Sequence, residues 1–386
     1  MSTLIHAPQV RPRRRQRGIA LILVTVGALA LIGMAGLALD LGVTYIAKSR
    51  LQNALDAAAL RGAKVLNKTR SVSLATTAAQ ADFATNMSGF GITAVVEMSP
   101  TLQPFVNGGL NLRFVRVSVD TLPVTLRLAQ ALPGIGESLN VAGSAVAGPM
   151  PLSNRICAAL PVALCGTGGD TDCSDGACFG YTADATTELE LKDDGTTIGP
   201  GNFGLVVLDC GTGAACIREG MAGKSNLCFT PGGTITVEPG GKSGPTSQGL
   251  NTRFNIYKGG VSASDYPPDV VIRHVPVIFH DAYELLLANP LAWDIQSPPG
   301  RPQRRMVVVP VIDCSTPING RKDANLLGGA CFFLTRPVED SGPGKGTLYG
   351  QLISGCEADG SVDVVPDADT PFYDIRLFRD PGSDQS

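Results

Sequence analysis

The chain has little material for acid–base or nucleophilic catalysis. Its 386 residues include three histidines, and His280 is followed directly by Asp281. Such a pair could serve a hydrolase, because an imidazole near a carboxylate can take a proton from a nucleophile. No serine or cysteine is marked as that nucleophile, and the Gly-x-Ser-x-Gly pattern of a nucleophile elbow is absent. The sequence therefore predicts no catalytic residues, and a hydrolase that uses His280 and Asp281 remains an alternative.

Two Gly-Lys-Ser triplets, at 223–225 and 241–243, resemble the end of a phosphate-binding loop. That pattern needs a glycine five residues before its second glycine, and those positions hold Arg218 and Thr236. The acidic segment 170–176 lacks the glycine and the glutamate that an EF-hand loop needs at its sixth and twelfth positions. We therefore predict no cofactor and no metal site.

Cysteines are concentrated in one part of the chain, and none lies before residue 157. An even number of cysteines is typical of a disulfide framework in an oxidising compartment. No pair has Cys-x-x-Cys spacing, which argues against a zinc or redox site. The ten predicted disulfide cysteines are Cys157, Cys165, Cys173, Cys178, Cys210, Cys216, Cys228, Cys314, Cys331 and Cys356. Three candidate pairs of sequence neighbours, which spacing alone does not assign, are Cys157/Cys165, Cys173/Cys178 and Cys210/Cys216.

The N-terminal region is predicted to set the position of the rest of the chain relative to a membrane. Residues 18–39 carry no charge and would form a helix about 33 Å long, enough to cross a hydrocarbon core of about 30 Å. Five arginines precede this segment and Asp40 follows it, so the positive-inside bias predicts a cytoplasmic N-terminus and an outer location for the rest. A cleaved signal ending near Ala30 is the alternative, but the apolar run continues to Leu39. The residues expected to set the orientation are Arg11, Arg13, Arg14, Arg15 and Arg17.

The helix is expected to continue beyond the membrane. Residues 40–67 contain no proline, and apolar side chains recur there at steps of three and four. A continuous helix over 18–67 would be about 75 Å long. Ala54, Ala58 and Gly62 form a stripe of small residues that either faces the core or packs against another subunit. An oligomer formed through the N-terminal helix is therefore possible.

Arg17-Gly18 precedes the apolar run, Asp40 ends it, and Tyr45 and the block at 50–60 follow. In these features residues 13–66 resemble the N-terminal region of TadE/TadG-like proteins, which belong to tight-adherence (Flp, type IVc) pilus assembly systems. The residues expected to carry the family motif and the helix packing are Gly18, Asp40, Tyr45, Leu51, Gln52, Asn53, Ala54, Asp56, Ala57, Ala58 and Gly62.

The resemblance implies a pilin-like module in which the outer half of the helix packs on a small antiparallel sheet. It implies a helix near 73–87, a strand at 113–120, and a strand, short helix and strand over 122–146. Pilins cut by prepilin peptidase carry a glutamate five residues after the glycine, and that place here is Leu23. The helix is therefore expected to stay in the membrane. The Asp-x-Ser-x-Ser metal loop of some such proteins is absent.

The remainder is expected to be rich in strands after a linker at 148–151. Gly/Pro-rich turns separate the predicted strands, and a short helix is expected at 280–288. Pro276 and Pro310 predict edge strands or bulges. The predicted strands cover 204–208, 234–237, 270–279, 306–312, 331–334 and 348–353. Three further segments resemble blocks in the distal part of some TadG-like proteins: 199–204, 249–254 and 266–269.

The sequence thus predicts an α+β protein with a long N-terminal transmembrane helix, a pilin-like module and a β-rich, disulfide-stabilised domain. The expected parts are a cytoplasmic basic tip (1–17), a transmembrane helix (18–39), a pilin-like periplasmic module (40–148) and a cysteine-rich periplasmic domain (149–386). We expect a single-pass bacterial inner-membrane protein with a non-catalytic, structural role in Tad pilus assembly. Its expected partners are other assembly components or minor pilins, not nucleic acid. The alternatives are an exported surface adhesin and a membrane-anchored periplasmic hydrolase.

Overall fold

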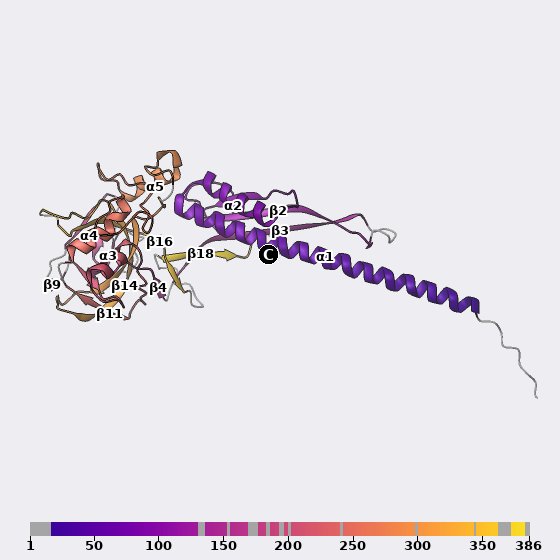
Figure 1. The fold of residues 1–386 in the computed structure, drawn as a ribbon, viewed down its shortest axis with the longest axis horizontal. Helices are drawn as coiled ribbons and strands as arrows, with labels where there is room; N and C mark the ends of the chain where they lie inside the picture. Colours follow the sequence, from indigo (N-terminus) through magenta and orange to yellow (C-terminus); the bar gives the residue numbers. More distant parts are fainter. Residues whose placement is uncertain are drawn as a thin grey trace, which may run out of the picture.

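A long helix leads into a small helix-and-sheet unit, and a β-rich unit follows at the far end (Figure 1). The structure is a computed structural model of the whole chain. The residues that it describes are 17–129, 136–152, 155–168, 177–182, 186–192, 197–199, 202–239, 242–297, 300–342, 345–361 and 372–382. The predicted α+β class is confirmed, with a long apolar N-terminal helix followed by disulfide-bonded sheets.

The first helix, α1 (Arg17–Thr69), is continuous over 53 residues, as the absence of proline predicts. A second helix, α2 (Val72–Asn86), begins after Ser71, whose side chain accepts the backbone N–H of Leu74 at 3.5 Å. Serine is favoured at this position because its oxygen satisfies a donor that the first turn leaves free. The helix predicted near 73–87 is therefore confirmed.

The outer half of α1 packs on a five-stranded sheet with the order β1-β2-β3-β18-β16. Neighbouring strands are antiparallel except β16 and β18, which are parallel. The strands are β1 (Val95–Ser99), β2 (Phe114–Thr125), β3 (Ser138–Pro151), β18 (Phe372–Phe378) and β16 (Cys356–Glu357). We call α1 from Asp40 onward, α2, β1, β2, β3 and β18 the proximal unit, because their buried side chains share one apolar core.

Two expectations for this region need correction. The linker predicted at 148–151 is wrong, because these residues form the end of β3 and pair with β18. Pro149 and Pro151 lie beyond Ala147, the last residue of β3 that pairs with β2, so this end of β3 has a partner strand on one side only. The short helix expected within 122–146 stays a prediction, because residues 130–135 between β2 and β3 lie outside the described residues.

The β-rich part between Leu152 and Ile353 forms the distal unit. Its main sheet has the order β11-β10-β5-β12-β14-β15-β8, and β11 also pairs with β14. Five strands therefore close on themselves, which removes two sheet edges. The strands are β5 (Val162–Gly166), β8 (Leu189–Leu191), β10 (Phe203–Val206), β11 (Thr234–Glu238), β12 (Met306–Asp313), β14 (Lys322–Leu334) and β15 (Leu348–Ile353).

Shorter elements surround this sheet. The paired short strands are β4 (Arg155–Cys157) with β17 (Asp359–Ser361), β6 (Ala177–Cys178) with β7 (Tyr181–Thr182), and β9 (Thr197–Ile198) with β13 (Ile318–Asn319). The helices are α3 (Ala214–Ala222), α4 (Ser243–Leu250), η3 (Asn251–Phe254), α5 (His280–Ala288) and η4 (Pro290–Ala292).

Five of the six predicted strands and the helix at 280–288 are confirmed by β10, β11, β12, β14, β15 and α5. The strand predicted at 270–279 is wrong: Val270 and Val271 are buried, but the segment makes no ladder. Pro276 supplies no N–H there. Pro310 lies in β12, a central strand and not an edge, opposite Gly329, and the expected bulge follows between Val311 and Ile312.

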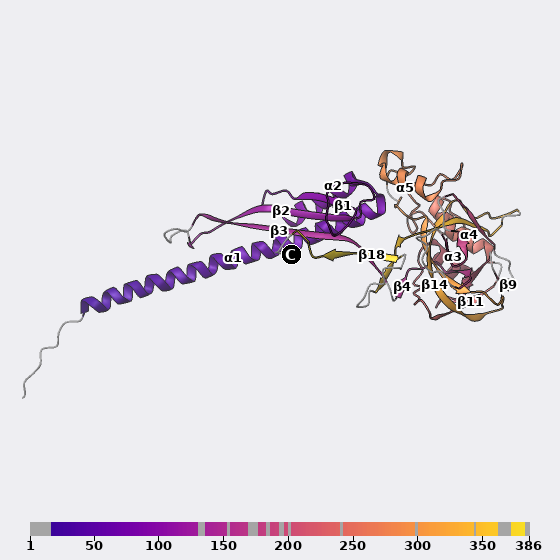
Figure 2. The ribbon, with the colours of Figure 1, turned by 180° about the vertical axis from the view of Figure 1, so that it is seen from behind.

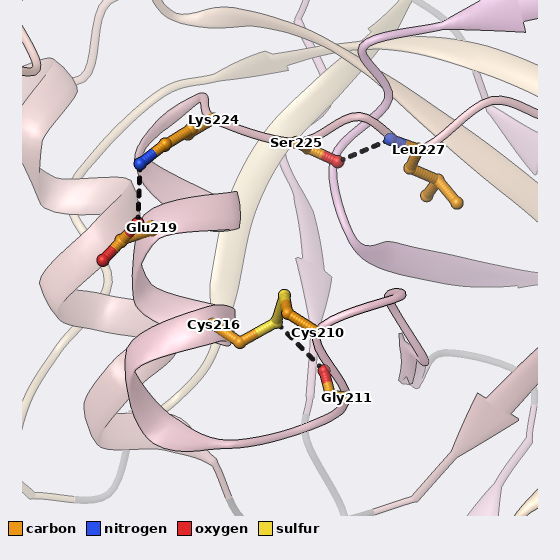
Figure 3. The surroundings of a disulfide bond; sticks show 7 residues. All are labelled: Cys210, Gly211, Cys216, Glu219, Lys224, Ser225 and Leu227. Atoms are coloured by element: carbon orange, nitrogen blue, oxygen red, sulfur yellow. Dashed lines mark hydrogen bonds and ion pairs between the residues drawn. A yellow bond between two sulfur atoms is a disulfide. The ribbon is translucent and has the colours of Figure 1, made fainter.

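Four disulfides have both cysteines among the described residues, and three of them lie within the distal unit. Cys157 bonds to Cys228 and Cys165 to Cys314, so the sequence-neighbour pair Cys157/Cys165 is wrong. Cys210 bonds to Cys216, which joins a turn to the first part of α3 (Figure 3). Cys331 of β14 bonds to Cys356 of β16, which covalently connects the distal sheet to the proximal sheet. Cys178 is also disulfide-bonded, and Cys173 lies outside the described residues.

Candidate functional site

The first part of α1 is a rod of exposed apolar side chains. The described residues contain one helix long and apolar enough to span a membrane, and it is this one, from Leu21 onward. Its apolar window is almost entirely exposed, which distinguishes it from the core helix of a globular protein. Lipid is the environment in which such a surface is stable, so the helix suggests membrane anchoring. Arg11 to Arg15 lie outside the described residues.

The block at 50–60 forms the face of α1 that packs on the sheet. Leu51, Leu55 and Ala58 have essentially no exposed surface and lie in the proximal core. Ala54 is equally buried, and a Cβ at Gly62 would lie 3.1 Å from Ala79 of α2 and from Val115 of β2. The stripe Ala54, Ala58 and Gly62 therefore lets the helix approach its own sheet and α2. It is not available for packing against another subunit.

The polar residues of the same block connect the helix to β3. The Gln52 side-chain amide donates to Asp56 Oδ1 at 2.9 Å and to the carbonyl of Ser144 at 3.1 Å. Gly143 allows this close approach, since a Cβ there would lie 3.0 Å from Leu55. Gln52 and Asp56 are thus half-buried positioning residues within the unit.

Asp40 is buried although it is charged. Its carboxylate accepts backbone N–H groups from Arg127 at 3.1 Å, from Leu128 at 2.8 Å and from Ala129 at 2.6 Å. Asp40 therefore holds the end of the β2–β3 hairpin against α1.

Two family-motif residues remain on the outside of α1. Tyr45 is 75% exposed and Asn53 is exposed. They line a shallow hollow of about 380 Å³ together with Asn86 of α2. Arg50 closes one side of it by donating to the backbone carbonyl of Asn86 at 3.1 and 3.0 Å. Ala57 is half-buried, and Gly18 belongs to the first turn of α1.

The end of α1 meets the distal unit through polar contacts. Arg70 donates to Glu284 of α5 at 3.0 Å, and both side chains are about one-quarter exposed. Gln303 donates to the backbone carbonyl of Asn67 at 2.8 Å. The sequence analysis assigned none of these residues to a motif. Each is an ordinary polar residue, and its partner is more than 200 positions away in the chain.

His280 lies at this same junction. Burial lowers its pKa, and Glu284 and Asp281 oppose that shift. Its Nε2 lies 3.7 Å from Glu284, its Nδ1 lies 3.8 Å from Asp281, and its ring contacts Phe333 edge-on. The arrangement fits an imidazole that packs in a junction. Among the described residues, no three His, Cys, Asp or Glu side chains are grouped so as to hold a metal ion.

A buried polar network lies behind His280. Asp269 accepts the Tyr283 hydroxyl at 2.7 Å and the Arg305 backbone N–H at 3.0 Å. Arg305 is fully buried, donates to the carbonyls of Leu334 and Thr335, and its guanidinium lies 4.6 Å from the Phe333 ring centroid. Burial raises the pKa of Asp269 to about 6.

Sequence reasoning did not assign a role to this network, although it marked the blocks that contain part of it. Asp269 ends the block 266–269, and Arg253 lies in the block 249–254. The backbone N–H of Asp269 donates to the carbonyl of Arg253 at 2.9 Å, so the two blocks are adjacent. Asn251 exchanges two hydrogen bonds with the backbone of Val338, at 2.9 and 2.8 Å. These blocks build the interior of the distal unit.

Comparison with protein families gives a match within α1. Residues 18–65 match the Tad family model, described as Flp pilus-assembly TadE/G-like. Segment 18–65 is TadE/G-like. The resemblance predicted over 13–66 is thereby confirmed for these residues. Comparison with curated proteins gives no match, and comparison with solved structures gives none either.

The TadE/G-like segment includes residues from both structurally distinct parts of α1. Its first part is the exposed apolar rod, and its second part is the helix face that packs on the proximal sheet. It ends at Val65, just before the contacts that Asn67 and Arg70 make with the distal unit. The match therefore fits a component of a Tad pilus system with membrane association.

Proposed function

We propose that this protein is a non-catalytic, single-pass component of tight-adherence pilus assembly in a bacterial inner membrane. The observation that carries the proposal is the TadE/G-like segment, which is a membrane-length apolar rod continuing without a break into the core of a folded unit. One rigid helix therefore joins the bilayer to the proximal unit. The role is structural, through contacts with other assembly components or minor pilins.

The orientation follows from charge and redox chemistry. The arginines before residue 18 favour a cytoplasmic N-terminus. The proximal and distal units are then periplasmic, where disulfides form and persist. The disulfides among the described residues are consistent with that compartment.

The proximal unit supports a pilin-like role. A long helix packs its outer half on a mostly antiparallel sheet, and the family resemblance implies a small antiparallel one. We propose the four parts predicted above, with the strand at 372–378 added to the pilin-like module because it pairs with β3. The cysteine-rich domain then stands beyond it, connected by Arg70, Gln303 and the Cys331–Cys356 bond.

Deletion and complementation in the source bacterium test the role. Deleting the chain should abolish or strongly reduce pili counted by electron microscopy and adherence to a surface, and the full chain should restore both. A chain whose first 39 residues are replaced by a cleavable signal should be exported but should not restore piliation, because the anchor is lost. Normal piliation in the deletion strain would show that the proposal is wrong.

One variant and one protease experiment separate the proposal from its rivals. His280→Gln should restore piliation as well as the full chain does, whereas a hydrolase that depends on His280 would not. Protease added to whole cells should leave the protein intact if both units are periplasmic. Digestion of the distal unit on whole cells would instead indicate an exported surface adhesin.

A further inference from the structure

The outer surface of α1 stays apolar beyond Asp40. Leu41 and Val43 are more than half exposed, and Ile46 is 67% exposed. Lys48 is the first charged residue after Asp40. Residues 18–47 of the helix rise about 45 Å, which matches the full thickness of a bilayer including its headgroup layers and exceeds the hydrocarbon core alone.

Asp40 does not interrupt this apolar surface. It is the one charged residue in 18–47. It is 5% exposed, and three backbone N–H groups at the end of the β2–β3 hairpin surround its carboxylate. A charge that is buried and hydrogen-bonded in this way can lie at the depth of the headgroups without facing lipid.

The hairpin end reaches the level of the predicted membrane span. β2 and β3 extend alongside α1 toward its N-terminus, past the other strands of the sheet (Figure 2). Gly36, three residues inside the span 18–39, is buried under Leu128: a Cβ at Gly36 would lie 2.9 Å from the Leu128 Cβ. Leu128 is itself 48% exposed, and Leu139 at the start of β3 is also exposed. Two elements therefore present apolar side chains at the same height, and on the hairpin these lie beside the exposed charged residues Arg127 and Glu137, which suit a headgroup layer.

We infer that the outer headgroup layer of the membrane extends along α1 to Tyr45 and Lys48, and that the described residues at the end of the β2–β3 hairpin, 126–129 and 136–139, are inserted in this layer beside the helix. The occupant of this surface is the phospholipid bilayer. The exposed apolar side chains continue those of the anchor, and Tyr45 and Lys48 are the residue types that mark a membrane–water interface. The inference rests on the membrane anchoring in the proposed function.

A bilayer whose outer boundary lies nearer the N-terminus of α1 fits the exposed apolar surface of the helix less well. If the hydrocarbon ended at Ala35 and the hairpin stood in water, the side chains of Leu39, Leu41 and Ile46 would all face water. A headgroup layer that extends to Tyr45 and Lys48, with the hairpin end inserted in it, removes this apolar surface of α1 from water. It also gives the proximal unit a second membrane contact, which restricts how far the unit tilts about α1.

Depth-dependent fluorescence tests the inference on the full chain. The chain has a single tryptophan, Trp293, in the distal unit. In a Trp293→Phe background, Leu128→Trp and Tyr45→Trp report on the two elements, Ile32→Trp on the membrane span and Leu291→Trp on the distal unit. Tyr45→Trp replaces an exposed aromatic ring and should not disturb folding, which circular dichroism checks. Each variant is reconstituted in phosphatidylcholine–phosphatidylglycerol vesicles whose acyl chains are brominated near the headgroup.

Leu128→Trp and Tyr45→Trp should both show about twofold lower emission in brominated than in unbrominated vesicles, as expected for rings at the headgroup–acyl boundary. Leu291→Trp should show no change. Quenching of Ile32→Trp without quenching of the other two would overturn the inference and leave the anchor intact. Absence of quenching in all four variants would overturn the anchor as well. Protection of Leu128→Trp by a second copy, seen as chemical cross-linking without quenching, would also overturn the inference.

Discussion

Asp40 and Ala129 are hydrogen-bonded to each other across 89 residues of sequence, with the Ala129 N–H 2.6 Å from the Asp40 carboxylate. The same carboxylate accepts the neighbouring N–H groups of Leu128 and Arg127. One side chain of the TadE/G-like segment thus determines where the free end of the β2–β3 hairpin lies.

Replacing this carboxylate should loosen the hairpin end. In Asp40→Ala, three backbone N–H groups lose their acceptor, whereas Asp40→Asn keeps one oxygen. Backbone amides that lose a charged acceptor should exchange hydrogen about tenfold faster. Hydrogen exchange of peptides covering 122–129, followed by mass spectrometry on the full chain in detergent, measures this. We expect Asp40→Ala to exchange faster than Asp40→Asn, and equal exchange in both variants and the wild type would contradict the role of Asp40.

Enlarging Gly62 should destabilise the proximal unit. An added Cβ at Gly62 would lie 3.1 Å from side-chain atoms of Ala79 and Val115. Gly62→Leu therefore overpacks the core and should lower the free energy of unfolding by about 1–3 kcal/mol. Gly42→Leu is the matched control in the same helix, because a Cβ at Gly42 meets nothing within 4 Å. Urea unfolding by circular dichroism measures both. A change of oligomeric state without loss of stability in Gly62→Leu would indicate that the stripe packs between subunits after all.

Removing the Cys331–Cys356 bond should weaken the connection between the two sheets. The bond closes a loop with a sequence separation of 25 residues, and the Cys331→Ala/Cys356→Ala variant should lose about 2–4 kcal/mol of stability. The Cys210–Cys216 bond spans 6 residues, so its removal should cost less, because a short loop restricts the unfolded chain less. Urea unfolding under non-reducing conditions compares them. An equal or larger loss from the shorter loop would contradict this ranking.

The network around Asp269 should make stability depend on pH. Burial raises the pKa of Asp269 from 3.8 to about 6, so the folded chain holds a proton that the unfolded chain has released between these values. The contribution of Asp269 is therefore present below about pH 4 and is lost as pH rises to about 6, by up to about 3 kcal/mol.

Asp269→Asn isolates this contribution from the other carboxylates. The difference in unfolding free energy between the wild type and Asp269→Asn, measured by urea unfolding at pH 4 and pH 6, should shift against the wild type at the higher pH. A difference that stays constant, or shifts toward the wild type, would show that the pKa of Asp269 is not raised by folding.

The sequence by itself determined the parts of this protein that depend on local pattern. The uncharged run 18–39, the arginines before it and the absence of proline in 40–67 predicted the long helix and its membrane-length segment, because helix formation and insertion depend on side chains that are close in sequence. The run of β-branched residues at 307–309 likewise predicted β12, and the apolar and aromatic residues of 348–353 predicted β15. The family block at 50–60 identified the segment that the Tad family model matches.

Only the tertiary structure decided which distant segments meet. The strand at 372–378 joins β3, Cys165 reaches Cys314, Asp40 binds the hairpin end, and Ala54, Ala58 and Gly62 face their own core. Each of these contacts depends on hydrogen bonding or packing between groups far apart along the chain, and a polar or small residue carries no local sign of its partner. The segment 270–279 shows the same limit: its pattern fits a strand, but the buried Asp269 and Arg305 hold it as a loop.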